Sequence, residues 1–79
     1  MMKFEVCVEL KGDVLDVQGR AIKETLARLG HQAISDVRVS KRFVLELDDS
    51  TPKARSVVDA VAKEYLASSV AETYVVKEL

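Results

Sequence analysis

The segment from Asp36 to Asp48 alternates between apolar and polar side chains with a period of two residues. This period predicts a β-strand with one buried face, because successive side chains of a strand point to opposite faces. A hairpin with a three-residue loop from Ser40 to Arg42 keeps this alternation, and so does one long bent strand. In both cases Lys41 is the only charged residue on the apolar face, so we expect it to reach solvent or to contact a partner.

A first strand and a first helix are predicted before this segment. Residues 3–11 alternate in the same way and place their apolar side chains on one face. A helix follows Asp16, a residue type favoured at the N-cap, and ends before Gly30, a residue type favoured just beyond a helix end. Its apolar residues recur at helical spacing, and we expect them to form a buried face: Ile22, Leu26 and Leu29.

A second helix and a last strand are predicted after the segment. Thr51 is expected to be the N-cap and Pro52 the first residue of a helix that continues to Leu66. Residues 70–79 predict a strand that is apolar on both faces, as in a central or covered strand. The resulting β-α-β-β-α-β order predicts a single ferredoxin-like domain over residues 1–79, of the α+β class and with an antiparallel sheet.

Both helices are expected on one face of this sheet, which leaves the other face open. The open face mixes charges with a few apolar side chains, as a packing surface for another chain does: Glu5, Cys7, Glu9, Arg38, Arg42, Val44 and Glu46. With two Phe, two Tyr and no Trp among 79 residues, the core is small and aliphatic. Small domains with such cores are often stabilised by oligomerisation, so the sequence favours self-association.

The residue content argues against several classes of function. Twelve basic and 13 acidic residues give a formal net charge of −1, which argues against nucleic acid as the partner. No apolar run approaches the roughly 20 residues of a membrane helix, and the N-terminus lacks a signal-peptide core, so we expect a cytoplasmic chain. One Cys and one His form neither a disulfide nor a good metal site, and three separated glycines form no phosphate loop. We interpret Cys7 as a small packed side chain and His31 as a helix-exit residue.

Three short segments, read together, carry a family resemblance: Leu15–Ala21, Asp36–Lys41 and Leu66–Tyr74. In this order and spacing they resemble the PurS subunit of phosphoribosylformylglycinamidine (FGAM) synthase. That family typically shows V-L-D-P-x-G, D-V-R-x-G-K and L-A-N-P-V-x-E-x-Y at these places. The chain departs from the motifs at Val17, where the family has proline, at Ser40, where it has glycine, and at Ser68-Ser69, where it has Asn-Pro.

The resemblance implies a small non-catalytic subunit of a complex that performs the fourth step of purine synthesis. Such a subunit forms homodimers through its sheet and bridges a synthetase subunit (PurL) and a glutaminase subunit (PurQ). It supports transfer of ammonia between their sites. ATP and Mg are used by the synthetase subunit, so the resemblance implies no cofactor on this chain.

The resemblance also implies roles for six residues. Asp16 and Gly19 are expected to shape the loop into the first helix. Arg38 and Lys41 match the central motif and are expected to make polar contacts with a partner. Glu72 and Tyr74 match the last motif, and Tyr74 is expected to be an aromatic interface anchor with a polar tip. For each of the six, structural support within the chain is the alternative interpretation.

Two other functions remain open from the sequence. One is a ferredoxin-like regulatory domain that binds a small metabolite at a subunit interface, with Gly12 or Gly19 in the ligand loop. The other is a small phosphate-ester or acyl-phosphate hydrolase of similar topology, which requires a positioned Asn. The chain contains no Asn, which argues against the hydrolase.

Overall fold

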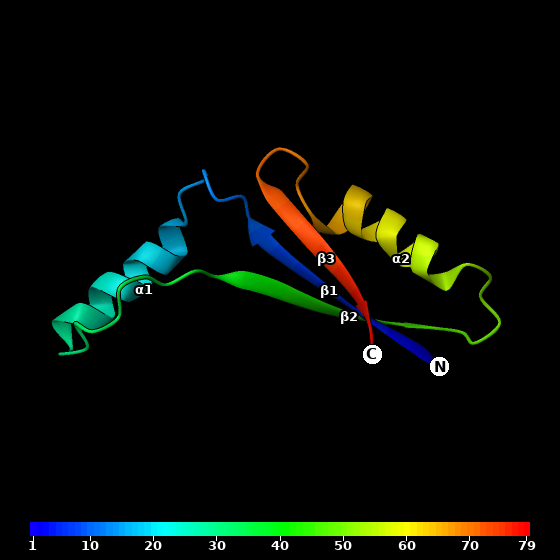
Figure 1. Ribbon diagram of the computed structural model, residues 1–79, viewed down its shortest axis with the longest axis horizontal. Coiled ribbons are helices and arrows are strands. Elements are labelled where there is room, and N and C mark those ends of the chain that lie inside the picture. Colours follow the sequence, from blue (N-terminus) through cyan, green and yellow to red (C-terminus); the bar gives the residue numbers. More distant parts are fainter.

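A three-stranded antiparallel sheet forms the centre of the molecule (Figure 1). The structure, a computed structural model, describes residues 1–79. Strand β1 (Met2–Leu10) lies between β2 (Ser40–Leu47) and β3 (Glu72–Glu78) and is antiparallel to both. Across the sheet, Val6 of β1 lies opposite Phe43 on one side and Val76 on the other. The alternating residues of the three strands therefore line up on one apolar face.

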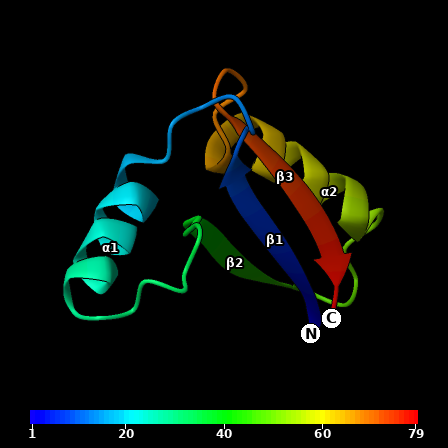
Figure 2. The same cartoon turned by 60° about the vertical axis from the view of Figure 1, so that its left-hand side comes forward.

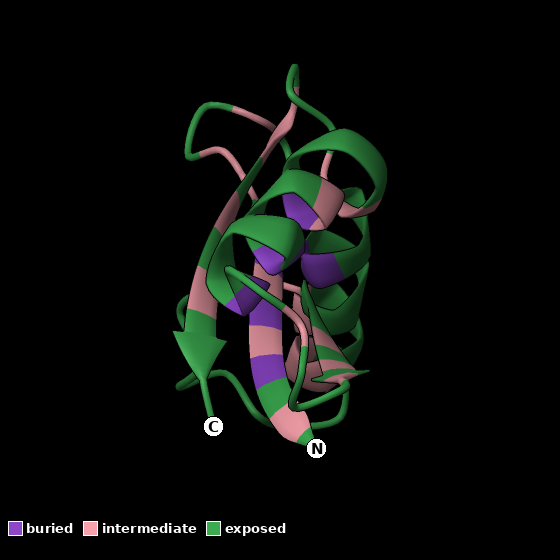
Figure 3. Ribbon diagram, turned by 90° about the vertical axis from the view of Figure 1, so that its right-hand side faces the viewer, coloured by how far each residue is buried: buried purple, intermediate pink, exposed green.

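The buried core lies between that face and helix α2 (Ala54–Val61). Phe4, Val6 and Val8 of β1 are each exposed by 2% or less. Three residues of the helical segment, spaced four apart, close over them: Ala54, Val58 and Ala62. Figure 3 shows the buried residues on β1 and on the helical segment that covers it. Side chains four apart share one helix face, so this spacing gives α2 its sheet-facing surface.

Helix α2 begins later than the sequence predicts, and the predicted cap is wrong. Thr51 donates its backbone N–H to the Asp48 carbonyl, which closes a turn and leaves Pro52 before the helix. Lys53 occupies the N-cap position with a φ of 49° and makes no side-chain cap bond. At its other end α2 continues into a short π-helical turn, η1 (Ala62–Leu66).

The central segment forms one strand and not a hairpin. Its first residues, Asp36 to Val39, run outside the sheet, and β2 begins at Ser40. Residues before Ser40 have almost no strand to pair with, because Ser40 pairs with Glu9, and β1 ends one residue later at Leu10. The α+β class, the antiparallel sheet and the two helices are confirmed, but the chain has three strands where the predicted β-α-β-β-α-β order has four.

Helix α1 (Val17–Arg28) does not join α2 on the sheet, so the expectation that both helices cover one face is wrong for α1. Figures 1 and 2 show α1 projecting beyond the end of the sheet, carried by two connecting segments. Asp16 is its N-cap and Gly30 follows its C-cap with a φ of 98°, both as predicted. Its predicted buried face is largely open, since Ile22 is 39% and Leu29 is 69% exposed.

The projecting helix makes the molecule long and thin. Its principal extents are 52 × 26 × 14 Å, and its radius of gyration is 16.2 Å. A compact domain of this length has a radius of gyration of about 12 Å. None of its helices has the length and apolar content needed to cross a membrane.

Candidate functional site at the base of the helical arm

We call residues 12–39, the segment that carries α1, the arm. One carboxylate, that of Asp16, holds the base of the arm. Asp16 is 6% exposed and accepts two backbone hydrogen bonds. Its Oδ1 accepts from the Gly19 N–H at 2.8 Å, and its Oδ2 accepts from the Val39 N–H at 2.6 Å. The first bond caps α1, and the second ties that cap to the residue before β2. Asp16 therefore joins the two connecting segments of the arm.

The hydrogen bonds at Asp16 favour its charged form. The Val39 N–H, and then the Gly19 N–H, hold the pKa of the Asp16 carboxyl below its ordinary value, and the Arg38 charge adds to this. Hydrogen bonds to a carboxylate stabilise the ionised state relative to the protonated one. The negative charge is thus part of the joint at the base of the arm.

Gly19 permits the close approach of the two connecting segments. A Cβ built at this position lies 2.2 Å from the Val37 carbonyl oxygen and 2.8 Å from Asp16 Oδ2. The first of these atoms belongs to the backbone and cannot turn aside as a flexible side chain does. Glycine is therefore required here for space, in the first turn of a helix where its flexibility is otherwise a cost.

Arg38 ties the arm to the end of β1. Its guanidinium donates to the Leu10 carbonyl at 3.2 Å and approaches the Lys11 carbonyl at 3.5 Å. The arm junction, defined here as Asp16, Gly19 and Arg38, thus unites residues from two of the motifs that the sequence singles out. Its hydrogen bonds are all internal, which is the structural-support interpretation of these residues.

Glu72 and Tyr74 also use their polar atoms within the chain. Glu72 accepts the Ser68 N–H on its carboxylate at 2.8 Å and donates its own N–H to the Ser68 carbonyl at 2.8 Å. Tyr74 is partly buried against the core and donates its hydroxyl to Asp59 at 3.1 Å. Burial, and then the Asp59 contact, raise the pKa of the Tyr74 hydroxyl. Glu72 and Tyr74 thus stabilise the turn and the strand that follow α2. Their contacts with a partner stay predictions.

Lys41 is the member of the predicted set whose charge is free. It is exposed, lies opposite Val8 in the register and forms no ion pair or side-chain hydrogen bond within the chain. It lines a cleft of about 320 Å³ between the end of the sheet and the arm. The negatively charged Glu72 lines the same cleft. The cleft also contains apolar side chains from both sides: Val8, Leu10, Leu15, Val17 and Val39. Three carboxylates share this lining with Lys41, those of Glu9, Asp16 and Glu72, and the partner contact of Lys41 stays a prediction.

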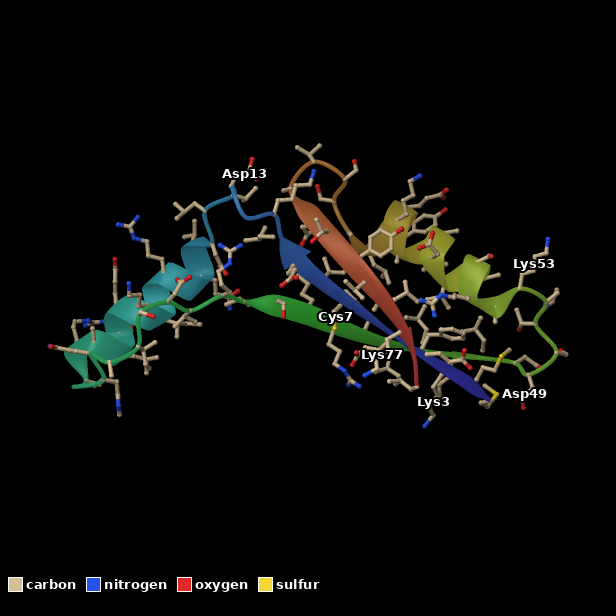
Figure 4. The ribbon with its side chains drawn as sticks, in the orientation of Figure 1. Lys3, Cys7, Asp13, Asp49, Lys53 and Lys77 are labelled. Atoms are coloured by element: carbon tan, nitrogen blue, oxygen red, sulfur yellow. The ribbon has the colours of Figure 1, made fainter.

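The face of the sheet away from α2 holds ion pairs. Arg42 pairs with Glu5, and this contact lowers the pKa of Glu5. Lys3 lies 3.7 Å from Glu46. Burial, and then the Glu5 charge, raise the pKa of the neighbouring Cys7 thiol, which disfavours the reactive thiolate. The packed interpretation of Cys7 is thus supported by its surroundings, and Figure 4 shows it on this face.

Some of the partners at the arm base cannot be predicted from residue types. The Val37 carbonyl and the Val39 N–H are backbone groups, about 20 residues along the chain from the groups they meet, and backbone groups carry no residue-type signature. The Ser68–Glu72 contact, by contrast, joins two residues only four apart in the sequence. No group of three or more His, Cys, Asp or Glu side chains is placed to hold a metal ion.

Comparison with known proteins decides the family. Residues 3–78 match the model of the family described as PurS: Phosphoribosylformylglycinamidine (FGAM) synthase. The chain belongs to the PurS family. It is 42% identical over 76 residues to the synthase subunit PurS of Mycobacterium leprae, covering 96% of this chain and 94% of the relative. It is 34% identical over 74 residues to the PurS subunit of Bacillus subtilis, covering 94% of this chain and 88% of the relative.

Solved PurS structures have the same fold. A crystal structure of B. subtilis PurS aligns with a TM-score of 0.91 at 32% identity and covers 100% of this chain and 99% of that one. A chain in the structure of PurLQS from Thermotoga maritima aligns with a TM-score of 0.78 at 28% identity, covering 99% and 96%. The projecting arm is part of the aligned length, so it belongs to the PurS fold.

Proposed function

We propose that this chain is a non-catalytic subunit of FGAM synthase that bridges the synthetase and glutaminase subunits and supports ammonia transfer between them. It acts in the cytoplasm as a homodimer or higher oligomer and binds no cofactor, since ATP and Mg serve the synthetase subunit. Its family membership and the PurLQS assembly of a structural relative support a role in the complex.

One observation carries the bridging role. The polar atoms of the motif residues hold the fold together. The molecule is long and thin, and every helix and strand except β1 carries exposed apolar side chains. Exposed apolar area on this scale is typical of a protein that binds other chains. Lys41, with its free charge beside the arm, is the best candidate for a polar contact to a partner subunit.

The test is synthesis of the amidine product by the synthetase and glutaminase subunits of the same source, with and without this chain. Two nitrogen donors are compared, glutamine and free ammonia. We expect glutamine-dependent synthesis to require the chain and ammonia-dependent synthesis to proceed largely without it. If neither reaction depends on the chain, the bridging role is wrong. Thermal-shift measurements with amino acids and nucleotides then test the metabolite-sensing alternative.

A further inference from the structure

Helix α1 has almost no packing within its own chain to hold it in place. It makes few contacts with the strands and with α2, and Gly19 is its only buried residue. Its apolar face is open, since Ile22 is 39% exposed and a shallow groove of about 270 Å³ lies on that face. Most helices take their stability and position from packing of an apolar face. The direction of α1 must therefore come from the two segments that join it to the sheet (Figure 2).

The entry segment, residues 11–16, is fixed to the end of the sheet. The Lys11 N–H donates to the Ala71 carbonyl at 2.9 Å, and Lys11 Nζ donates to the Ser69 carbonyl at 3.0 Å. The Val14 N–H then donates to the Lys11 carbonyl at 3.0 Å, which closes a turn. The entry segment is thus joined to the loop before β3 and folded on itself before it reaches α1.

The return segment, residues 29–39, is fixed where it approaches β2. The Arg38 guanidinium donates to the Leu10 carbonyl at 3.2 Å, at the end of β1. The Val39 N–H donates to Asp16 Oδ2 at 2.6 Å, in the entry segment. Hydrogen bonds in which one partner is charged are roughly twice as strong as neutral ones. The return segment is therefore held by two strong bonds, one to the sheet and one to the entry segment.

These contacts leave no free hinge at the base of α1. A swing of the helix about its base breaks the bonds of Arg38 and Val39 to their partners. Water does not readily replace the Val39 bond, because Asp16 is only 6% exposed. The Val37 carbonyl also lies so close to Gly19 that a Cβ there would be 2.2 Å from its oxygen, so the two segments cannot approach further.

We propose that the arm junction, and not the partner that covers α1, sets the direction of the arm. The inference goes beyond the proposed function and does not depend on which chain covers the apolar face. A surface that is already in its bound position loses less conformational freedom on binding. A partner therefore meets the apolar face of α1 in a preset place.

The alternative is an arm that swings at its base and takes its direction from the surface on which it packs. Residues 30–39 have no regular secondary structure, and such segments are commonly mobile. The two interpretations differ in the effect of weakening the junction while a partner still covers α1.

Distances between two spin labels test the proposal in the assembled protein. The labels are attached to Arg28→Cys on α1 and Ser56→Cys on α2, both at exposed positions, in a chain that carries Cys7→Ala. Labelled chains are diluted in an excess of unlabelled chains with the same junction, so that distances within one chain are measured even in an oligomer. Pulsed electron paramagnetic resonance gives the distance distribution. We expect a single narrow distribution when the junction is intact.

Two variants each remove one bond of the junction and leave the α1 cap in place. Arg38→Ala removes the bond to the end of β1, and Val39→Pro removes the N–H that Asp16 Oδ2 accepts. We expect each to broaden the distribution at least about twofold, because one of the two bonds that hold the return segment is lost. The matched control is Arg20→Ala, which removes an exposed charge of the arm that pairs only with Glu24 of the same helix. It is expected to leave the distribution narrow.

Each outcome decides for or against the preset direction. A broad distribution in the chain with an intact junction overturns it, because the arm is then hinged. A narrow distribution that neither variant changes also overturns it, because the covering partner then sets the direction. Circular dichroism checks that α1 stays helical in the variants, and loss of the helix in both would mean that the junction forms α1 and does not direct it. None of these results bears on the bridging role, which the glutamine-dependent synthesis tests separately.

Discussion

Gly19 shows how one missing side chain sets the position of the arm. Replacing it with Ala places a methyl group 2.2 Å from the Val37 carbonyl oxygen, so one of the two connecting segments must move. We expect Gly19→Ala to lower the melting temperature by roughly 5–15 °C, since forced overpacking costs about 1–3 kcal/mol. Circular dichroism melts measure this. The control is Gly12→Ala, which has nothing within 4 Å of the new Cβ and is expected to melt within about 2 °C of wild type. Equal melting of the two variants would contradict the steric role.

Asp16 makes stability depend on pH in a defined direction. Because its pKa is lowered in the folded chain, the Asp16 charge stabilises the fold above the ordinary Asp pKa of about 4. That contribution is lost as the pH falls through the folded pKa. We expect Asp16→Asn to melt lower than wild type at pH 7 and to approach wild type as the pH is lowered from about 5 to about 2. Melting curves across this range measure the difference. A constant gap between the two proteins would show that the charge plays no part.

Lys41 is predicted to act between chains and not within this one. It forms no internal ion pair, so Lys41→Ala is expected to change the melting temperature by less than about 3 °C. We expect the same variant to weaken assembly with the synthetase and glutaminase subunits by about tenfold, in pull-down or interferometry. Lys53→Ala, an exposed lysine outside the cleft, is the control for loss of a positive charge. Normal assembly combined with a lower melting temperature would assign Lys41 to the fold.

At the scale of elements, the two helices are expected to differ sharply in stability. α2 covers buried residues of β1, whereas α1 buries only Gly19. We expect amide hydrogen exchange to be fast in α1 in dilute solution and to slow by at least about tenfold at concentrations where oligomers form, while β1 stays protected throughout. Exchange read out by mass spectrometry resolves the two regions. Equal protection of α1 and β1 in dilute solution would contradict this.

The elements could be predicted from the sequence where the signal is local. Neighbouring residues alone predict the alternation in β1 and β2, the Asp16 cap and the Gly30 end of α1. Each of these predictions is confirmed. The Thr51-Pro52 signal predicts too early a start for α2, because Asp48 closes a turn over these residues.

The placement of α1 could not be predicted from the sequence. An amphipathic pattern shows that a helix has a face to bury, but it does not say against which surface or in which chain. Two connecting segments hold α1 away from its own sheet through the Asp16 and Arg38 bonds to backbone groups. Of the candidate residues, only Lys41 keeps a side chain free for a partner, which the motif itself did not distinguish.

At the scale of the whole molecule, stability is expected to depend on protein concentration. A chain with eight buried residues out of 79 has a very small core of its own. If copies pair, mass action raises the melting temperature as the concentration increases. We expect a rise of about 5 °C or more between 1 and 100 µM, measured by scanning fluorimetry or calorimetry. The same melting temperature at both concentrations would mean that the single chain is stable alone.

The exposed arm also bears on the fate of a surplus copy in the cell. Proteases cut segments that open locally, and a helix without packing contacts opens readily. A copy that has found no partner therefore presents the arm as a cleavage site, whereas a partner packed on the apolar face of α1 would conceal it. Degradation of the unassembled copies would keep the amount of this subunit matched to the complex that uses it.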